Sequence, residues 1–199
     1  MTHFPVMEHF YTLQGEGKFA GHAAYFIRLA GCDVGCSWCD VKESWTTDGF
    51  PLFTPDQLLQ LVTDLNANRV VITGGEPTMH QLETITDVFR SNNIKTHIET
   101  AGVNYISGNW DWVCLSPKKF KNALPDSYLK ADELKIIVFN QHDLSWCIEE
   151  SEKVNERCLL YLQPEWSKKD VLLPIIIEFI KNNPKWQLSL QTHKYINIP

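Results

Sequence analysis

Patterns typical of short strands alternate with patterns typical of amphipathic helices along most of this 199-residue chain. The strand-like runs are apolar and β-prone, and they cover residues 24–29, 69–73, 94–100, 112–115, 133–138, 158–162 and 186–192. The helix-like runs cover residues 54–65, 82–89, 142–155 and 172–181. This alternation predicts a parallel sheet with right-handed crossovers, and it constrains the fold more than any other feature of the sequence.

Chain length narrows this α/β class further. A closed eight-fold barrel usually needs about 250 residues, so six or seven strands in a shorter chain close only part of a barrel. The composition shows no internal boundary. We therefore predict a single domain, residues 1–199, folded as an open, partial (β/α)6-type TIM-like barrel with a parallel sheet and outer helices.

Two local signals place helix starts. Thr54 can cap a helix, Pro55 suits its first position, and Gln57 completes a capping box. In the helix over residues 172–181, Pro174 is expected in the first turn, because an interior proline breaks a helix.

Polar residues gather where the predicted strands end. They are Gly75, Glu76, Glu99, Thr100, Ser116, Gln163 and Thr192. Function in parallel α/β folds gathers at the C-terminal ends of the strands, and the cysteine-rich run 31–40 follows the first predicted crossover strand at the same rim. A weakly alternating run from residue 6 ends in a polar QGEG turn, which can place Gln14 and Glu16 side by side.

Three of the six cysteines, Cys32, Cys36 and Cys39, lie within eight residues in the run GCDVGCSWCD. Three thiolates at this spacing can hold three corners of a four-iron cluster and leave the fourth iron open to a small ligand. A zinc site is an alternative, although the nearest histidine, His22, has no finger-like second half. Packing of three small hydrophobes is a second alternative, which the polar character of the loop disfavours. The scattered cysteines are expected to pack in the core: Cys114, Cys147 and Cys158.

The charge distribution argues against two classes of partner. With a net charge of −6 and no basic block beyond the Lys118, Lys119 and Lys121 group, a surface that follows nucleic-acid phosphates is not expected. The most apolar segment, residues 171–180, is too short to span a membrane, and no secretory signal pattern is visible. We therefore expect a cytoplasmic protein with reduced cysteines that acts on a small-molecule or protein substrate.

The cysteine spacing, with Trp38 before the third cysteine and GGEP at residues 74–77, resembles the radical S-adenosylmethionine (SAM) superfamily. The resemblance implies that Cys32, Cys36 and Cys39 hold a [4Fe-4S] cluster whose open iron binds SAM. Reductive cleavage of SAM would give a 5′-deoxyadenosyl radical, so no side chain is assigned as catalytic. By position, the SAM site would comprise Trp38, Cys39, Asp40, Gly75, Glu99, Ser116, Pro117, Lys118, Gln163, Pro164, Glu165 and Trp166.

Within this superfamily the chain resembles the 7-carboxy-7-deazaguanine synthase family over nearly its full length. The stretches that carry the likeness are FYTLQGEG, residues 26–31, CSWCD, TGGEP, IET, LSPK, ELKIIV, LQPE and LQTHKYINIP. The resemblance implies a carbon–nitrogen lyase that rearranges 6-carboxy-5,6,7,8-tetrahydropterin to 7-carboxy-7-deazaguanine, losing ammonia, on the route to queuosine in tRNA. It further implies a flavodoxin- or ferredoxin-type reductant and a homodimer. By position, the pterin would be bound by Leu13, Gln14, Gly15, Arg28, Thr73, His193 and the terminal carboxylate of Pro199.

Glu16 joins this set on chemical grounds. The 2-amino group of a pterin and its neighbouring ring N–H are parallel donors that one carboxylate accepts together, while Gln14 offers both a donor and an acceptor. Arg28 suits the substrate carboxyl group. Each side chain has an alternative role: an ion pair with a loop carboxylate for Arg28, a solvated turn for Glu16, and a hydrogen bond near the terminus for His193.

Residue 41 departs from the pattern that the resemblance implies. In the family a threonine or serine hydroxyl at this position usually ligates Mg²⁺, and this chain has Val41. Magnesium prefers oxygen ligands and keeps waters, so Asp40, a backbone carbonyl or the substrate can still hold it. Sodium, or no metal at all, is the alternative.

Two other functions share part of these motifs. An activating enzyme that makes a glycyl radical on a partner protein has the same cysteine spacing and a small size, but it has no reason to carry QGEG or the polar QTHK tail. A non-catalytic iron–sulfur or zinc module would account for the cysteines alone.

Overall fold

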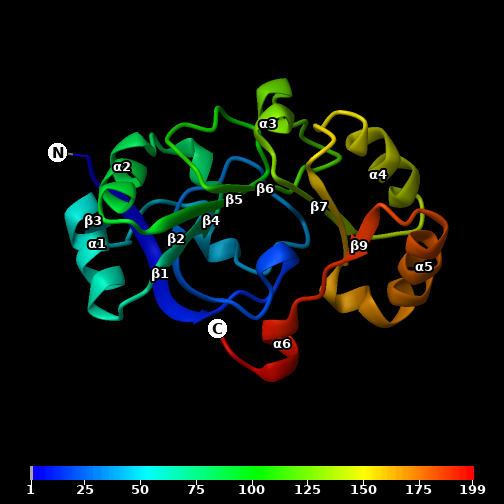
Figure 1. The fold of residues 1–199 in the computed structure, drawn as a ribbon, viewed down its shortest axis with the longest axis horizontal. Helices are drawn as coiled ribbons and strands as arrows, with labels where there is room; N and C mark the ends of the chain where they lie inside the picture. Colours follow the sequence, from blue (N-terminus) through cyan, green and yellow to red (C-terminus); the bar gives the residue numbers. More distant parts are fainter. Residues whose placement is uncertain (1) are drawn as a thin grey trace.

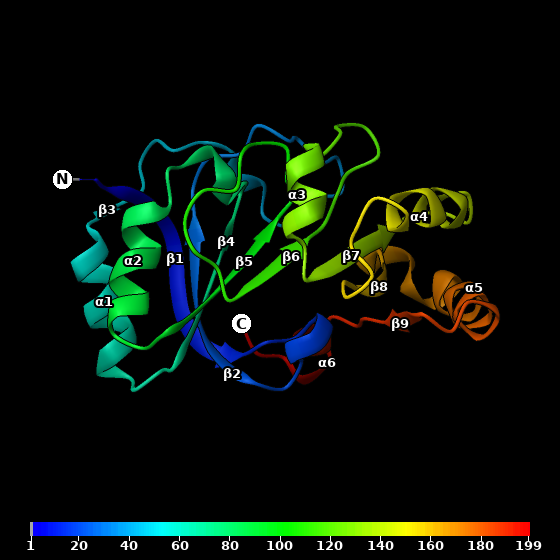
Figure 2. The ribbon, with the colours of Figure 1, turned by 45° about the horizontal axis from the view of Figure 1, so that its top comes forward.

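The computed structural model describes residues 2–199, which form one curved sheet of nine strands with helices outside it (Figures 1 and 2). The strands are β1 (Phe4–Leu13), β2 (Ala23–Leu29), β3 (Leu52–Phe53), β4 (Arg69–Gly74), β5 (Lys95–Thr100), β6 (Trp112–Leu115), β7 (Glu133–Val138), β8 (Leu159–Pro164) and β9 (Trp186–Leu188). Their spatial order is β3-β1-β2-β4-β5-β6-β7-β8-β9. From β2 to β9 every neighbouring pair is parallel, while β1 and β3 add an antiparallel edge.

The helices lie mainly on the convex side of the sheet. They are α1 (Pro55–Asp64), α2 (Glu83–Ser91), α3 (Pro125–Lys130), α4 (Asp143–Ser151), α5 (Lys169–Asn182) and α6 (Thr192–Ile196), with short 3₁₀ turns η1 (Gly17–Phe19), η2 (Lys42–Trp45), η3 (Pro77–Met79) and η4 (Trp166–Lys168). Figure 2 shows α1 to α5 around the outside, whereas α6 lies below the open side of the sheet. The crossover from β5 to β6 has no helix.

Two apolar cores lie between the sheet and its helices. The first includes Leu58 and Val62 of α1 and Phe89 of α2, all completely buried against the strands at the N-terminal end of the chain. The second packs α4 and α5 against β6 to β9, with Ile176 and Trp186 among its most buried members. Because both cores lie outside the sheet, the concave side is free to carry polar side chains.

The two ends of the curved sheet meet through loops instead of through a ladder. The carbonyl oxygen of Gly15, just after β1, accepts hydrogen bonds from the backbone N–H of Thr192 (2.9 Å) and from its hydroxyl (2.8 Å). The backbone N–H of Gly17 donates to Oγ of Ser189, which follows β9 (3.0 Å). The C-terminal tail therefore crosses the opening of the partial barrel and ends beside β1 and β2 (Figure 1).

The predicted fold class is confirmed, and so is the capping box at α1: Gln57 N–H donates to Thr54 Oγ1, and Thr54 N–H donates to Gln57 Oε1. The placement of Pro174 is wrong. Helix α5 begins at Lys169, so Pro174 is its sixth residue and lies inside the helix. The sequence pattern gave no sign of the turn from Lys169, because Lys169 and Asp170 are polar and precede the apolar run. Burial of Leu172 and Ile176 against the sheet offsets the cost of an interior proline.

Smaller differences concern element ends. Helix α4 is shorter than the predicted 142–155, β9 stops at Leu188 instead of residue 192, and the first strand covers Phe4–Leu13 and not the run from residue 6 to the turn. The sequence also gave no signal for β3, α3 or α6, which have two, six and five residues. Among the described residues, no helix has both the length and the apolar character needed to cross a membrane.

Candidate active site

A cavity of about 400 Å³ opens on the concave side of the sheet, at the C-terminal ends of the parallel strands. All but one of the residues assigned from the sequence to a cluster, SAM or a pterin line it. Those residues are Leu13, Gln14, Gly15, Glu16, Arg28, Cys32, Cys36, Trp38, Cys39, Asp40, Thr73, Gly75, Glu99, Ser116, Lys118, Gln163, Pro164, Glu165, Trp166, His193 and Pro199. Pro117 instead lines a neighbouring cavity of about 280 Å³ on the other side of Trp38.

The cysteine loop forms one wall of the cavity. Cys32, Cys36 and Cys39 are free thiols of intermediate exposure, in contrast to Cys114, which is buried. The loop is held by its backbone: Cys39 N–H donates to the carbonyl oxygen of Cys36 (3.1 Å), and the N–H of Val41 donates to Cys39 Sγ (3.4 Å). Burial raises the pKa of the Cys36 thiol, and Lys118 acts in the opposite direction.

The spacing of these thiols fits a cluster better than a single ion. A zinc ion needs all of its ligand atoms within about 2.0–2.3 Å of one point, and no group of three such side chains in residues 2–199 converges in that way. A four-iron cluster binds each thiolate to a different iron, so its ligands lie farther apart. Three partly exposed thiols on one loop, facing a cavity, suit that group.

The GGEP loop supports the cysteine loop through close backbone contact. Gly75 N–H donates to the carbonyl oxygen of Leu29 (3.0 Å), and Glu76 N–H donates to that of Gly31 (2.8 Å). A Cβ atom on Gly75 would collide with the Gly31 carbonyl oxygen and lie 2.8 Å from Cys32 Cβ. The glycine is therefore needed for the β4 end to approach the first cysteine.

Glu76 has a structural role beside it. This carboxylate is buried and accepts hydrogen bonds from the Thr78 hydroxyl (2.6 Å), the Thr100 hydroxyl and the backbone N–H of Ala101 (2.7 Å). It thereby ties the loop after β4 to the loop after β5. Several hydrogen bonds of this kind fix the orientation of the carboxyl group.

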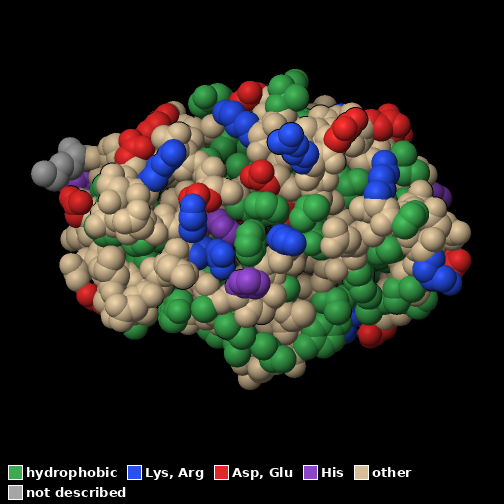
Figure 3. Space-filling view, viewed as in Figure 1, with side chains coloured by type: hydrophobic (Ala, Val, Ile, Leu, Met, Phe, Trp, Pro, Cys, Tyr) green, Lys and Arg blue, Asp and Glu red, His purple; other side chains and the backbone are tan. Residues whose placement is uncertain are grey.

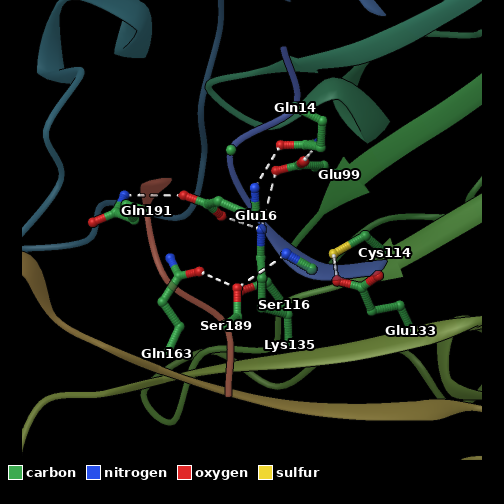
Figure 4. Close-up of polar contacts among 12 residues, drawn as sticks. Gln14, Glu16, Glu99, Cys114, Ser116, Glu133, Lys135, Gln163, Ser189 and Gln191 are labelled. Atoms are coloured by element: carbon green, nitrogen blue, oxygen red, sulfur yellow. Dashed lines mark hydrogen bonds and ion pairs between the residues drawn. The ribbon is translucent and has the colours of Figure 1, made fainter. Parts of the chain in front are cut away.

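The opposite wall carries a network of polar side chains (Figure 4). Lys135, on β7, forms ion pairs with Glu16 Oε2 and with Glu99 Oε2 (3.3 Å). Gln14 Nε2 donates to Glu99 Oε1 (2.8 Å), and Gln191 Nε2 donates to Glu16 Oε1 (3.0 Å). The QGEG turn, β5, β7 and the C-terminal tail are thus joined around two carboxylates.

Interactions within this network favour the charged forms of Glu16 and Lys135. Burial opposes the charge on Glu16, yet Lys135 and the hydrogen bond from Gln191 lower the pKa of the Glu16 carboxyl to about 2. Burial would lower the pKa of Lys135, but the surrounding acidic groups, Cys114, Glu16 and Glu99 among them, raise it well above its usual value. Both groups are ionised throughout the physiological range.

The QGEG turn is also held by contacts of its flanking residues with β7 and with the C-terminal tail. Lys18 N–H donates to Glu133 Oε2 (3.1 Å), and Trp112 Nε1–H donates to the same oxygen (3.2 Å). Gly15 allows the imidazole of His193 to approach, because a Cβ atom there would lie 2.8 Å from His193 Cγ. Burial lowers the pKa of His193, which favours the neutral imidazole, although Glu16 acts in the opposite direction.

Arg28 does form an ion pair, but its partner lies on a strand. Its Nε donates to Glu8 Oε1 at 2.6 Å, across the antiparallel β1–β2 pair in which the two residues are register partners. The guanidinium also borders the cavity. The bond to Glu8 uses Nε and not the two terminal nitrogens that form the fork of an arginine.

The remaining assigned side chains gather at the rim nearest the cysteines. Lys118 Nζ donates to the carbonyl oxygen (2.6 Å) and the hydroxyl (2.9 Å) of Ser116, and burial lowers its pKa. Asp40 forms an ion pair with Lys194 of the C-terminal tail (2.8 Å). As a magnesium ligand, Asp40 would have to exchange this cationic partner, and the carbonyl oxygen of Val41 already accepts from Ser44.

Sequence reasoning missed several residues of the cavity wall. The most informative are Lys135, Gln191 and Lys194. Lys135 had a visible signal, because it is the one basic residue in the run ELKIIV and has apolar neighbours on both sides, as Arg28 does. Gln191 and Lys194 were noted only as part of the tail motif LQTHKYINIP, and nothing assigned them to the cavity, because their place depends on how the tail crosses the open barrel.

Comparison with known proteins agrees with this geometry. The profile of the Radical SAM superfamily matches residues 26–119, which include the cysteine loop and the GGEP loop. The 7-carboxy-7-deazaguanine synthase of Flavobacterium psychrophilum is 50% identical over 98% of this chain and 92% of that protein. The Escherichia coli K12 enzyme of the same name is 35% identical over 98% and 99%. The crystal structure of QueE from Escherichia coli superposes with a TM-score of 0.88 at 33% identity, covering 96% of this chain and 95% of that one.

The open α/β barrel with three thiols facing its cavity defines a radical SAM enzyme. Within that class, the chain belongs to the 7-carboxy-7-deazaguanine synthase family. Membership decides against the activating-enzyme and non-catalytic alternatives. It also implies the [4Fe-4S] cluster and SAM.

Proposed function

We propose that this chain converts 6-carboxy-5,6,7,8-tetrahydropterin to 7-carboxy-7-deazaguanine with loss of ammonia, as a radical SAM lyase on the route to queuosine. The observation that carries the proposal is that one cavity is lined both by the cysteine loop and by the Glu16–Lys135–Glu99 network. A radical enzyme must hold its cofactor and the substrate carbon that it attacks side by side. One cavity with a thiol wall and a polar wall meets that requirement.

Cys32, Cys36 and Cys39 would hold the cluster. Bound there, the cluster and SAM would supply the 5′-deoxyadenosyl radical chemistry, with SAM serving as a regenerated cofactor. The protein's part is placement. The residues assigned to SAM lie at the ends of β2, β4, β5, β6 and β8 or in the loops that follow these strands. They comprise Trp38, Cys39, Asp40, Gly75, Glu99, Ser116, Pro117, Lys118, Gln163, Pro164, Glu165 and Trp166, of which Pro117 faces the neighbouring cavity.

The opposite wall would hold the pterin. Glu16 accepts from the 2-amino group and the ring N–H, which requires an ionised carboxylate. Arg28, on the neighbouring strand, pairs with the substrate carboxyl through its terminal nitrogens, while Glu8 holds Nε. The other contacts come from Leu13, Gln14, Gly15, Thr73, His193 and the terminal carboxylate of Pro199.

This chain offers fewer protein ligands for a divalent metal than the family pattern does. Val41 offers no side-chain oxygen, and Asp40 is paired with Lys194. We therefore propose that Mg²⁺ is not essential for turnover. The test is activity after chelation, with and without added Mg²⁺, and a strong dependence would show that Asp40, a backbone carbonyl or the substrate holds the ion.

The external partners are proposed on family grounds. A flavodoxin- or ferredoxin-type protein would deliver the electron, and the chain would act as a homodimer of one-domain subunits. Reduction by purified flavodoxin and sedimentation of the reconstituted enzyme test these two statements separately.

The activity itself is tested by anaerobic reconstitution with iron and sulfide, followed by incubation with 6-carboxytetrahydropterin, SAM and a reductant. Mass spectrometry should show the deazaguanine product, with SAM recovered at the end of the reaction. A protein that binds its cluster and cleaves SAM to 5′-deoxyadenosine, yet leaves the pterin unchanged, would contradict the proposed substrate.

A further inference from the structure

Lys135 is an ammonium group enclosed by acidic side chains under the cavity. Its side chain is only 4% exposed, and it pairs with Glu16 of the QGEG turn and with Glu99 at the end of β5. The other titratable groups that act on it are Cys114, Glu133 and Lys118. Burial of a charged lysine costs hydration free energy, and ion pairs with surrounding groups of this kind offset that cost.

The two carboxylates need this cation. Without it, Glu16 and Glu99 would be two anions close together in a largely buried site, an arrangement in which one of them takes up a proton. His193 cannot replace Lys135, because its pKa is lowered and its imidazole is neutral near pH 7. Glu133 cannot relieve the repulsion either, since it is a third acid, whose pKa burial raises.

The network also fixes the orientation of the two carboxylates. Gln14 links them, because its Nε2 donates to Glu99 Oε1 (2.8 Å) while its Oε1 accepts from the backbone N–H of Glu16 (3.0 Å). Gln191 holds the second oxygen of Glu16. Each carboxylate oxygen has two lone pairs, so both groups can still accept from a ligand in the cavity.

We infer that Lys135 is a positioning residue that balances the charges of the Glu16 and Glu99 carboxylates, so that Glu16 can accept from the donor edge of the pterin while Glu99 keeps its proposed place beside SAM. The inference rests on the proposed function for the identity of the ligand. It assigns Lys135 no contact with the substrate. Its effect passes through the two carboxylates.

The first test measures binding in the holoenzyme without turnover. Reconstituted protein with SAM, left unreduced, is dialysed anaerobically against 6-carboxytetrahydropterin between about pH 5 and about pH 8. For the unaltered protein, the dissociation constant should vary less than about threefold. For Lys135→Met, affinity should fall as the pH falls, by up to about tenfold per pH unit below the raised carboxyl pKa, because one proton must leave before the pterin binds.

Three further variants separate positioning from packing. Lys135→Arg keeps a permanent charge, so its pH profile should stay flat even if the bulk of arginine weakens binding. Lys135→Met combined with Glu99→Gln removes one charge of each sign, so the pterin affinity of this double variant should also be independent of pH. Lys95→Met, on the exposed end of β5, is the matched control and should change nothing. An equal loss of affinity at every pH in Lys135→Met would overturn the inference.

A second readout needs no pterin. A protonated carboxyl group has an infrared C=O band that a carboxylate lacks, so Lys135→Met should gain such a band near neutral pH, and the double variant should lose it. Absence of the band in Lys135→Met overturns the inference whatever the ligand is. Failure of the unaltered protein to bind the pterin, with the band present as expected, contradicts the proposed substrate and leaves the charge role of Lys135 supported.

Discussion

The two walls of the cavity are built in opposite ways. The cysteine wall is an irregular, partly exposed loop held by backbone hydrogen bonds, and its chemistry depends on three side chains at fixed spacing. The polar wall is a largely buried network whose members come from the QGEG turn after β1, from β5, from β7 and from the tail, and whose charges depend on one another. A loop of the first kind carries a group that does the chemistry, whereas a network of the second kind recognises shape and hydrogen-bond donors.

The positions in the sequence reflect this difference. The cysteine wall lies within ten residues, while Glu16 and Gln191 of the polar wall are 175 residues apart. Single changes should therefore act differently at the two walls. At the cysteine wall they should remove function outright, and at the polar wall they should weaken substrate binding by graded amounts.

The largest effect is expected at the cysteine wall. Cys36→Ala removes one of three cluster ligands, so iron content, the broad visible absorbance of the cluster and turnover should all be lost. Cys158→Ala is the matched control, because Cys158 lies in the second apolar core, away from the cavity. Pterin conversion by Cys36→Ala would mean that this thiol is not a ligand, and loss of iron in Cys158→Ala would mean that folding and not ligation is being measured.

The next effect concerns the support behind that wall. Gly75→Ala should displace the Gly31 carbonyl and Cys32, because its methyl group has no room. Most of the iron should be lost at equilibrium while the helical content by circular dichroism stays unchanged. The control is Gly49→Ala, where a Cβ atom meets nothing but φ is +85°, so only backbone strain of about 1–2 kcal/mol is expected. Full iron content in Gly75→Ala would show that the loop can move aside.

At the polar wall, Glu16→Gln should leave iron and SAM cleavage intact and lower kcat/KM for the pterin by about tenfold to about a hundredfold. That range corresponds to one hydrogen bond to a charged group, about 1.5–3 kcal/mol. The loss should appear mainly in KM, because the carboxylate binds the substrate and does not act on the reacting carbon. Glu149→Gln, on the exposed side of α4, is the control. An unchanged KM would show that Glu16 does not bind the substrate and has a structural role instead.

How much could be predicted from the sequence differs between the walls for a physical reason. Ligand spacing within one loop is a local property, so the three cysteines could be proposed from the sequence alone, whereas Trp38 and Gly75 were assigned through the resemblance to the family. Glu16 was found because a pterin needs a carboxylate, but its partners Lys135 and Gln191 depend on the register of strands and on the path of the tail. No local pattern shows that β7 will place the side chain of Lys135 against a turn that lies 119 residues earlier.

The same limit applies to the fold. Alternation of strand and helix patterns predicted the parallel sheet and the open barrel, since each crossover is a local unit. It did not predict α6, which has five residues and no apolar stripe of its own. Its position follows from the bonds between Gly15 and Thr192, which form only once the sheet has curved. Pro174 was misplaced because a buried helix can retain an interior proline that an isolated helix would not.

A smaller effect is expected on stability in acid. The pKa of Glu16 is about 2 in the folded protein and near 4.5 when unfolded, so the unfolded state binds the proton more readily. The stability that Glu16 contributes is therefore fully present above about pH 4.5 and is lost as the pH falls toward about 2, by on the order of 2–3 kcal/mol. Urea unfolding of the unaltered protein and of Glu16→Gln should give curves that differ most at neutral pH and converge in acid. A constant difference across that range would mean that the ion pair with Lys135 contributes no net stability.

The smallest effect lies outside both walls and checks that the others are local. Thr54→Ala removes the hydroxyl that accepts from Gln57 N–H at the start of α1, which should lower the free energy of unfolding by about 1 kcal/mol. Helix α1 packs on the convex face, so iron content and KM for the pterin should not change. Thr54→Ser keeps the hydroxyl and should recover most of the loss. If Thr54→Ala altered KM as Glu16→Gln does, a general loss of stability in the sheet would explain both results. The effect of Glu16→Gln on KM would then be no evidence that the polar wall binds the substrate.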